Sequence, residues 1–544
     1  MKCIATIPVD LKETPLGTAS RFAQEIAGQS VLARTITQVA AARRLDGVFV
    51  ICPADQEAQC GQLLTGLPAE LRIHSAGRPP YGPLVRAARK WSLDSWRGGI
   101  GGAGVVDEYV HTAVLGALGA QERADVVVAI PGPCPLIDPA LIDILIEHYR
   151  GVSDESRLAF MQTPPGLAPT VFQTALLAEM ATQPVPPGFS MSYRPDQPEV
   201  DLAFRKCART PPQALRHASG RLIADTARAV ETIREYLEGN PYGGAEHVGN
   251  WLIERRPRHL PPLPREVEIE LTTEDPRAGR SDILLRPTLP ADRRRGPIDP
   301  AIVRRLAAEL AAWDDSLVVL GGFGDPLLHP QFAQILGDLR RAGVYGVAVR
   351  TTGLALDDAA IAALMEHRVD LVTVLLDAWS PSLYRRLHGG ELQPLVDAIE
   401  RLEKTRLEQR RPQPLVCPEM IKSVHTLDEI EPFFDGWIRR TGWATIVGHS
   451  RYAGALPDLS VMDMSPPMRS SCRRIRDRCT VLADGTLVAC DQDFAGARPI
   501  GSLADRSLAD LWNGPEMTRL RADHDAGRYE ADPLCAACAE WHRP

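Results

Sequence analysis

The chain has 544 residues, a formal net charge of −8 and 24% charged residues, and its acids and bases are interleaved without a basic tract. With aromatic residues at only 6%, this composition argues against a nucleic-acid-binding protein. It contains no run of about eighteen apolar residues, so we predict no membrane-spanning helix, and its length predicts about two to four domains.

Residues 1–245 alternate short apolar runs with amphipathic segments. Strands are predicted at residues 3–9, 47–53, 71–76 and 125–130, and helices at 31–44, 111–118 and 139–149. This alternation predicts a mostly parallel sheet with helices on both faces. Because the first strand begins at Cys3, we expect no signal peptide and a cytoplasmic protein, in which cysteines bind metal more readily than they form disulfides.

A proline-rich stretch at residues 254–264 separates the two halves of the chain. Proline has no amide hydrogen and fits neither a helix interior nor a central strand. We therefore expect an interdomain linker over residues 246–264.

The alternation of strands and helices resumes over residues 265–450. Strands are predicted at residues 267–271, 317–320, 346–350, 371–376, 415–421 and 445–448, and helices at 300–313, 330–342, 357–367, 392–408 and 427–439. This run of strand–helix units predicts a full or partial (β/α) barrel. The predicted fold class is therefore α/β in both halves of the chain.

Residues 451–544 are rich in loops and carry five of the eleven cysteines. These five are Cys472, Cys479, Cys490, Cys535 and Cys538. The C-x-x-C spacing of the last pair lets two thiolates reach one metal centre, and two such groups form a four-thiolate site suited to zinc or to an iron–sulfur cluster. An Asp484-Gly485 turn predicts a hairpin that leads to Cys490. The alternative is that the cysteines only pack, as small hydrophobic side chains.

This C-terminal segment resembles the SPASM domain of radical SAM enzymes. The agreement extends from Cys472 to Cys538 and includes Asp484-Gly485, Ile500-Gly501 and Leu511-Trp512. The resemblance implies an auxiliary [4Fe-4S] cluster, with zinc as the alternative. It assigns ligand roles to Cys472, Cys490, Cys535 and Cys538, and Cys479 is the alternative to Cys472.

The predicted barrel resembles the radical SAM core at the ends of three strands. The similar stretches are Gly321-Gly322-Phe323-Gly324-Asp325-Pro326, Val349-Arg350-Thr351-Thr352-Gly353 and Val374-Leu375-Leu376-Asp377-Ala378. In that family the first stretch reads Gly-Gly-x-Gly-Glu-Pro and approaches the methionine part of SAM. The resemblance implies cofactor-binding roles for Gly321, Gly322, Gly324, Asp325 and Asp377.

The cluster-binding motif of that family, C-x3-C-x2-C, is missing from this chain. Residues 273–282 stand in its place without a cysteine, and none lies between Cys207 and Cys417. Since carboxylates and hydroxyls are poor ligands for iron of this kind, we expect no cluster in the barrel and no adenosyl radical. We interpret the barrel as degenerate, kept for its shape or for ligand binding, and SAM binding stays open.

Residues 1–245 resemble the cytidylyltransferase-like nucleotidyltransferases of GT-A type. The resemblance is carried by residues 4–8, 21–32 and 130–139. It implies a triphosphate bound with Mg²⁺ and a basic residue on the first loop, here Arg21. The metal-binding Asp of that family is replaced by Pro133, and Asp138 and Asp201 are the candidate acids that are left.

A glycine-rich loop at residues 98–104 precedes a predicted helix that opens at Val106. The backbone amides of Gly98, Gly99 and Gly101 can bind phosphate together with the dipole of that helix. The alternative is a mobile glycine loop without a ligand, since a glycine run alone is a weak signal.

In their order, the three segments resemble the spiro-SPASM family. The first hypothesis is an iron–sulfur-binding protein that is not a radical enzyme. It would act as a scaffold, an electron relay or a substrate-binding partner of a protein or peptide in a modification pathway. The second is an Mg²⁺-dependent sugar or polyol nucleotidyltransferase that uses CTP, with a nucleotide or nucleotide-sugar ligand and a regulatory barrel. Neither hypothesis involves nucleic acid or a membrane.

Overall fold

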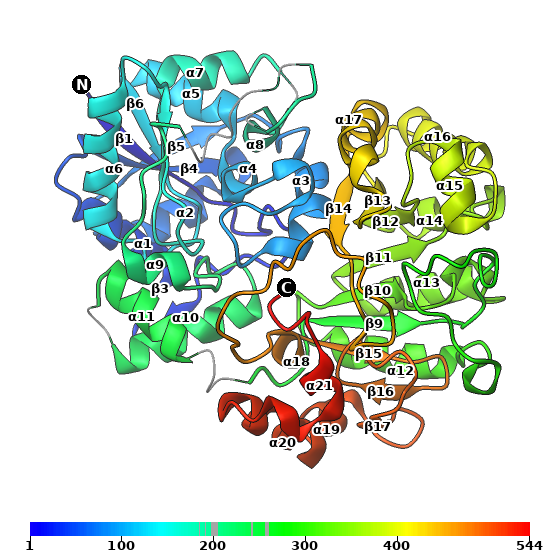
Figure 1. The fold of residues 1–544 in the computed structure, drawn as a ribbon. Helices are drawn as coiled ribbons and strands as arrows, with labels where there is room; N and C mark the ends of the chain where they lie inside the picture. Colours follow the sequence, from blue (N-terminus) through cyan, green and yellow to red (C-terminus); the bar gives the residue numbers. More distant parts are fainter. Residues whose placement is uncertain are drawn as a thin grey trace. The chain divides into compact units, whose positions relative to one another are not determined.

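The computed structural model describes residues 1–183, 185–190, 192–196, 198, 205–240, 243–255 and 260–543. The chain divides into two compact units, residues 1–258 and 259–544, which Figure 1 colours from blue to green and from green to red. Among the described helices, none combines the length and apolar character needed to cross a bilayer.

The first unit is built around a six-stranded sheet with the strand order β5-β4-β1-β6-β8-β7. Its strands are β1 (Cys3–Pro8), β4 (Gly47–Pro53), β5 (Glu70–His74), β6 (Val126–Ala129), β7 (Leu158–Ala159) and β8 (Thr170–Gln173), and a separate short hairpin joins β2 (Glu25–Ile26) to β3 (Gln29–Ser30). Strands β5, β4, β1 and β6 are parallel, as predicted, whereas β8 runs antiparallel to both of its neighbours.

Helices cover both faces of this sheet (Figure 1). They are α1 (Val31–Ala40), α2 (Glu57–Leu63), α3 (Gly82–Arg89), α4 (Val105–Tyr109), α5 (Thr112–Gln121), α6 (Pro139–Val152), α7 (Thr174–Met180), α8 (Pro187–Ser190), α9 (Gln213–His217), α10 (Ala227–Gly239) and α11 (Ala245–Arg255). The apolar side chains of α1 and α6 belong to one core, and those of α5 and α7 to another. Because β1 is covered on both faces, its first five residues are all buried, which explains its continuous apolar sequence.

Helix α11 corrects the predicted linker. It occupies most of the first half of residues 246–264 and packs against α9 in the first unit. The first proline that follows in the sequence is Pro257, so nothing before it interrupts a helix. Residues 256–259 of the predicted linker lie outside the described residues.

The second unit contains a nine-stranded sheet with the order β14-β13-β12-β11-β10-β9-β15-β16-β17. Its strands are β9 (Glu266–Glu270), β10 (Leu317–Gly321), β11 (Gly346–Thr351), β12 (Leu371–Leu375), β13 (Leu415–Lys422), β14 (Thr445–Gly448), β15 (Arg478–Val481), β16 (Thr486–Val488) and β17 (Gly501–Ser502). Strands β9 to β14 pair in chain order and in parallel. They form the predicted partial (β/α) barrel.

The helices that follow the barrel strands lie along one side of the sheet (Figure 1). They are α12 (Pro300–Leu310), α13 (Phe332–Ala342), α14 (Asp358–Glu366), α15 (Pro381–His388), α16 (Gln393–Glu408) and α17 (Ile430–Thr441), and the C-terminal segment adds α18 (Arg474–Asp477), α19 (Leu508–Trp512), α20 (Pro515–Asp525) and α21 (Pro533–Ala537). Alternate strand residues such as Val267 and Ile269 pack into this helical layer. Because strand side chains alternate between faces, Glu268 and Glu270 point to the other side, into the barrel.

The cysteine-rich segment continues the barrel sheet. Strand β15 pairs in parallel with β9, and β16 pairs antiparallel with β15 across the predicted Asp484-Gly485 turn. The Trp512 indole is buried and donates a hydrogen bond to the Pro261 carbonyl at 3.0 Å. The barrel and the cysteine-rich segment therefore form one compact unit rather than two.

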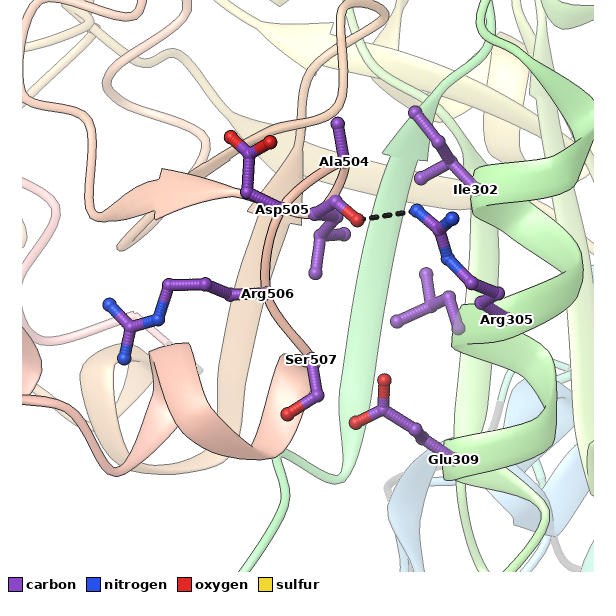
Figure 2. Close-up of a pocket in the computed structure, with 9 residues that line it drawn as sticks. Ile302, Arg305, Glu309, Ala504, Asp505, Arg506 and Ser507 are labelled. Carbon is purple, nitrogen blue, oxygen red and sulfur yellow. Dashed lines mark hydrogen bonds between the residues drawn. The ribbon is translucent and has the colours of Figure 1, made fainter.

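Helix α12 anchors the C-terminal segment across a pocket of about 300 Å³, shown in Figure 2. Arg305 donates to the Leu503 carbonyl at 2.7 Å. The Glu309 carboxylate accepts the amide hydrogens of Leu508 and Ala509 at 3.1 and 3.0 Å. These two amides open α19 and lack partners inside the helix, so Glu309 fixes the start of α19.

Candidate functional site

Four of the five C-terminal cysteines line one cavity. They are Cys472, Cys490, Cys535 and Cys538. Cys472 lies two residues before α18, Cys490 two residues after β16, Cys535 within α21, and Cys538 directly after it. Residues far apart in the sequence are thus brought together by the hairpin and by the return of the chain through α19 and α20.

Cys479 lies elsewhere. It is buried on β15, in register with Val267 of β9, and belongs to the apolar core under the barrel helices. Of the two alternatives left by the spacing, the structure brings Cys472 to the cavity and places Cys479 in the core.

The C-x-x-C turn is held by main-chain hydrogen bonds. Asp532 caps α21 by accepting the Leu534 amide at 2.9 Å. The Cys538 amide bonds to the Cys535 carbonyl at 3.2 Å, and the Glu540 amide donates to Cys538 Sγ at 3.3 Å. This geometry aims both thiols of the turn into the cavity.

Burial makes three of these thiols, those of Cys490, Cys535 and Cys538, weaker acids. It raises the pKa of Cys535 to about 12, and it raises the pKa values of Cys490 and Cys538 as well. Arg474 pairs with Asp491 at 2.6 Å. Its positive charge partly offsets the effect of burial by lowering the pKa values of Cys490 and Cys538. A metal or cluster would bind thiolates and displace these protons.

The donor set fits a soft metal group, while the space is tight. Four thiols converge on free space of about 20 Å³, so a cluster would need the cysteine side chains to rotate outward. Within the described residues, no three His, Cys, Asp or Glu side chains lie close enough to share a single metal ion.

At the barrel mouth, Gly324 and Asp325 contact the start of the segment that replaces the C-x3-C-x2-C cluster motif, residues 273–282. The Asp325 amide bonds to the Glu274 carbonyl at 2.8 Å, and its carboxylate accepts the Thr351 hydroxyl at 2.9 Å and the Thr352 amide at 3.0 Å. A Cβ on Gly324 would lie 2.1 Å from the Thr272 carbonyl oxygen. The glycine is needed here for a close approach of two backbone segments.

Gly321 and Gly322 lie at the same strand end. The Gly322 amide donates to Glu268 at 3.2 Å, and a Cβ on Gly322 would lie 2.8 Å from the Glu270 Cβ. A Cβ on Gly321 would lie 3.2 Å from the Arg350 Cβ. The two glycines therefore face charged side chains of the barrel.

Charged side chains of the protein itself occupy the barrel interior. Arg286 pairs with Asp377, and also with Glu419 at 3.3 Å. Arg350 pairs with Glu419 at 2.9 Å, and His388 lies 3.3 Å from Asp377. Burial opposes the ionisation of Asp377, but Arg286 and His388 hold its pKa well below the usual range. Of this network, only Asp377 was predicted as a site residue from the sequence, since its partners are distant in the chain.

In the first unit, the predicted phosphate-binding groups are engaged by the protein. Arg21 donates to the carbonyls of Ala19 and Asp225 at 3.0 and 2.9 Å. The amides of Gly98 and Gly99 both donate to the Ala103 carbonyl, and Gly101 adopts a φ of 68° within a short 3-10 turn.

The two candidate acids of this unit have different outcomes. Asp138 caps α6, accepting the Ala140 amide at 2.7 Å and the Ala245 amide at 2.6 Å. Asp201 lies outside the described residues.

A cavity of about 1070 Å³ opens at the carboxyl ends of β1, β4 and β5, where Pro8, Pro53 and His74 line it. Sites in open α/β sheets usually lie at this edge. Its cations are paired: Lys12 with Asp55 at 2.5 Å, Arg78 with Glu13 at 2.7 Å, and Arg86 with Glu13 at 2.7 Å. No sequence motif predicts this cavity, and its one signal in the sequence is a scatter of prolines beyond the strand ends.

A fully buried ion network lies beside this cavity. Arg221 donates to Glu108 at 2.6 Å and to Asp225 at 2.7 Å, and Arg89 donates to Glu108 at 2.6 Å. Burial opposes the ionisation of Glu108, but Arg221 and Arg89 lower its pKa. A guanidinium therefore lies between the two carboxylates, in a place that a divalent cation would need in order to bind both.

Two sequence families match parts of the chain. Residues 472–539 match the family model of the SPASM domain, an iron–sulfur cluster-binding domain. Residues 279–410 match that of the radical SAM superfamily. The chain contains a radical SAM domain and a C-terminal SPASM domain. These two domains indicate iron–sulfur binding. The SPASM match includes all five C-terminal cysteines, and the radical SAM match begins beyond residues 273–278 of the segment that replaces the cluster motif.

Relatives and solved structures show weaker similarity. An uncharacterized protein of Treponema pallidum (strain Nichols) is 24% identical over 309 residues, which are 54% of this chain and 82% of that protein. BtrN in complex with AdoMet and 2-DOIA is 17% identical, covering 51% of this chain and 93% of its own, with a TM-score of 0.34.

Streptococcus suis SuiB bound to the precursor peptide SuiA is 11% identical, covering 52% of this chain and 72% of its own, with a TM-score of 0.38. A cytidylyltransferase from Leptospira borgpetersenii is 14% identical, covering 46% of this chain and 92% of its own, with a TM-score of 0.30. These TM-scores are low, and we draw no function from the three structures.

Proposed function

We propose that the protein binds one [4Fe-4S] cluster through Cys472, Cys490, Cys535 and Cys538 and works without an adenosyl radical. It serves as a scaffold, an electron relay or a substrate-binding partner for a protein or peptide in a modification pathway. The observation that carries this proposal is the position of these four thiols around a single cavity of the SPASM domain.

The radical SAM domain supports the non-radical part of the proposal. The chain has no cysteine between Cys207 and Cys417, so the position of the cluster motif in this domain is without thiols. A cluster that reduces SAM needs thiolate ligands. The mouth of the domain is crossed by the Arg286–Asp377 pair. The mouth of the barrel therefore holds ion pairs formed by the protein's own side chains.

The distribution of the thiols favours a cluster over zinc. A zinc ion draws four sulfurs to about 2.3 Å from one centre, whereas each ligand of a [4Fe-4S] cluster binds a different iron. The four cysteines come from three segments around a cavity, with Arg469 and Arg474 in its wall. These cations offset the negative charge of a thiolate-bound cluster.

Anaerobic purification followed by iron, sulfide and zinc analysis tests the proposal. We expect about four irons per chain, from the composition of the cluster, and loss of iron in Cys535→Ala. The matched control is Cys479→Ala, which removes a buried cysteine of the same domain outside the cavity and keeps the iron. One zinc per chain without sulfide would refute the cluster assignment.

A second candidate function is Mg²⁺-dependent use of CTP by the first unit. The cavity at the ends of β1, β4 and β5 favours this function, because the size of the cavity suits a small-molecule ligand. The pairing of Arg221 with Glu108 and Asp225 argues against a metal at that network. Equilibrium dialysis of CTP against the protein with and without Mg²⁺ tests it. Mg²⁺-dependent retention of CTP would support transferase chemistry, and retention independent of Mg²⁺ would support binding alone.

A further inference from the structure

Within the described part of the chain, the Nε2 atom of His524 is an unpartnered hydrogen-bonding group in the wall of the cysteine cavity. His524 lies on α20, is only 2% exposed and lines the cavity together with the four cysteines. Its Nδ1 accepts the amide hydrogen of Cys472 at 3.3 Å. Its Nε2 is buried and has no hydrogen-bond partner among the described residues.

The accepting Nδ1 fixes the tautomer of the ring. A neutral imidazole has one donor and one acceptor nitrogen, so an Nδ1 that accepts a hydrogen bond leaves the proton on Nε2. Tyr529 packs edge-on against the ring, with the centroids 5.2 Å apart, and limits its rotation. A buried N–H group without an acceptor is costly, which points to an acceptor in the cavity that belongs to a bound group.

The two arginines of the cavity wall each bond to the protein through a terminal nitrogen, and each also has a buried Nε without a hydrogen-bond partner among the described residues. Arg469 donates to the Cys535 carbonyl at 2.6 Å, and Arg474 pairs with Asp491 at 2.6 Å. A cluster held by the four cysteines would present sulfur acceptors, either cysteine Sγ or inorganic sulfide, to the cavity wall. His524 differs from the arginines in that its single N–H group has no other partner among the described residues.

We propose that His524 donates a hydrogen bond from Nε2 to a sulfur of the SPASM cluster and thereby raises the reduction potential of that cluster. This inference rests on the proposed cluster. Reduction adds one negative charge to the cluster, and a hydrogen bond to sulfur stabilises the more negative state. His524 is thus a positioning residue that sets the potential, and its amide contact also orients Cys472.

Two substitutions separate the roles of the two ring nitrogens. His524→Asn keeps an acceptor near the position of Nδ1 and removes the Nε2 donor. His524→Gln places an amide donor near the position of Nε2 and removes the Nδ1 acceptor. His542→Gln is the control, since His542 follows Cys538 by four residues in the sequence and does not line the cavity.

The measurement is the midpoint potential of the full-length protein, titrated anaerobically with iron content determined in parallel. We expect His524→Asn to lower the midpoint potential by about 59 mV, which corresponds to a tenfold smaller equilibrium constant for one-electron reduction. We expect His524→Gln and His542→Gln to stay near the wild-type value. Equal potentials in wild type and His524→Asn, or equal losses in His524→Asn and His524→Gln, would overturn the inference.

Pulsed EPR of the reduced wild-type protein, grown with ¹⁵N-histidine, decides the matter if His524→Asn loses its cluster. A ¹⁵N coupling that persists in His542→Gln supports the hydrogen bond, and a spectrum without any ¹⁵N coupling contradicts it. If the wild type itself holds no iron, the proposed function fails, and the inference fails with it. Iron at the wild-type level with an unchanged potential in His524→Asn overturns the inference alone.

Discussion

Gly324 illustrates how a residue typical of SAM binding has a structural use in this chain. Its Cα faces the Thr272 carbonyl so closely that an added Cβ would lie 2.1 Å from the oxygen. The adjoining Asp325 then bonds to Thr351 at the end of β11 and to Thr352 directly after it. The two residues together tie the segment after β9 to the neighbouring strand ends.

Replacing Gly324 by alanine therefore destabilises the second unit. The clash is with backbone, which cannot rotate away, so we expect a loss of about 1–3 kcal/mol or more and a lower Tm in thermal unfolding. Gly296→Ala is the matched control, because no atom lies within 4 Å of its added Cβ. Equal melting temperatures for the two variants would show that the close approach is unimportant.

Glu268 makes stability depend on pH. Burial raises its pKa to about 7, although Arg350 acts in the opposite direction. The folded protein thus holds this proton more tightly than the unfolded chain, whose Glu pKa is about 4.3. The stability from Glu268 is complete below that value and is lost as the pH rises through about 7.

We expect the Tm of the wild type to fall relative to that of Glu268→Gln between about pH 5 and pH 8, by the equivalent of at most about 3 kcal/mol. Glutamine keeps an oxygen acceptor for the Gly322 amide and cannot titrate in this range. Parallel pH profiles of the two proteins would contradict a raised pKa at this position.

Among the elements, α12 and α19 join the barrel to the SPASM domain. Glu309 of α12 accepts the first two amides of α19, and Trp512 at the end of α19 is buried. A carboxylate at a helix N-terminus satisfies unpaired amides and interacts favourably with the helix dipole.

Glu309→Ala should loosen α19 at a cost of about 1–2 kcal/mol. The expected result is faster amide hydrogen exchange in residues 508–512. Glu516→Ala is the control, since Glu516 is exposed and pairs with Arg519, and an exposed ion pair contributes little to stability. Unchanged exchange in Glu309→Ala would mean that burial of Trp512 alone holds the helix.

At the level of elements, periodicity was sufficient for most of the fold. The apolar runs at β1, β4 and β9 to β14 gave the parallel strands to within about two residues. Strand β8 was not predicted, and its antiparallel direction depends on pairing with β6 rather than on local sequence. Helix α11 was missed because the linker indicated by the prolines of residues 257–264 was predicted to begin already at residue 246.

The candidate site was predictable only in part. C-x-x-C spacing singles out Cys535 and Cys538 by itself, whereas the choice between Cys472 and Cys479 needed the pairing of β15 with β9. His524 carries no sequence signal, since one histidine on an exposed helix usually has no special role. The Arg286–Asp377 pair joins residues that are 91 positions apart, which no local pattern reveals.

In the whole molecule, two kinds of chemistry are separated within the second unit. The thiols that can hold a cluster gather in the SPASM domain, and the radical SAM domain contains buried ion pairs at its mouth. The first unit adds a separate cavity at the edge of its sheet. On this account, any electron that enters the protein resides at the SPASM cysteines and does not reach SAM.

Quantifying 5′-deoxyadenosine tests this claim most directly. The full-length protein is purified with its iron, reduced anaerobically with dithionite and incubated with SAM, beside a protein-free control. We predict iron at the level of one cluster and no 5′-deoxyadenosine above the control. Formation of 5′-deoxyadenosine that scales with protein concentration would contradict the account, because it would require a reducing cluster next to SAM in the barrel.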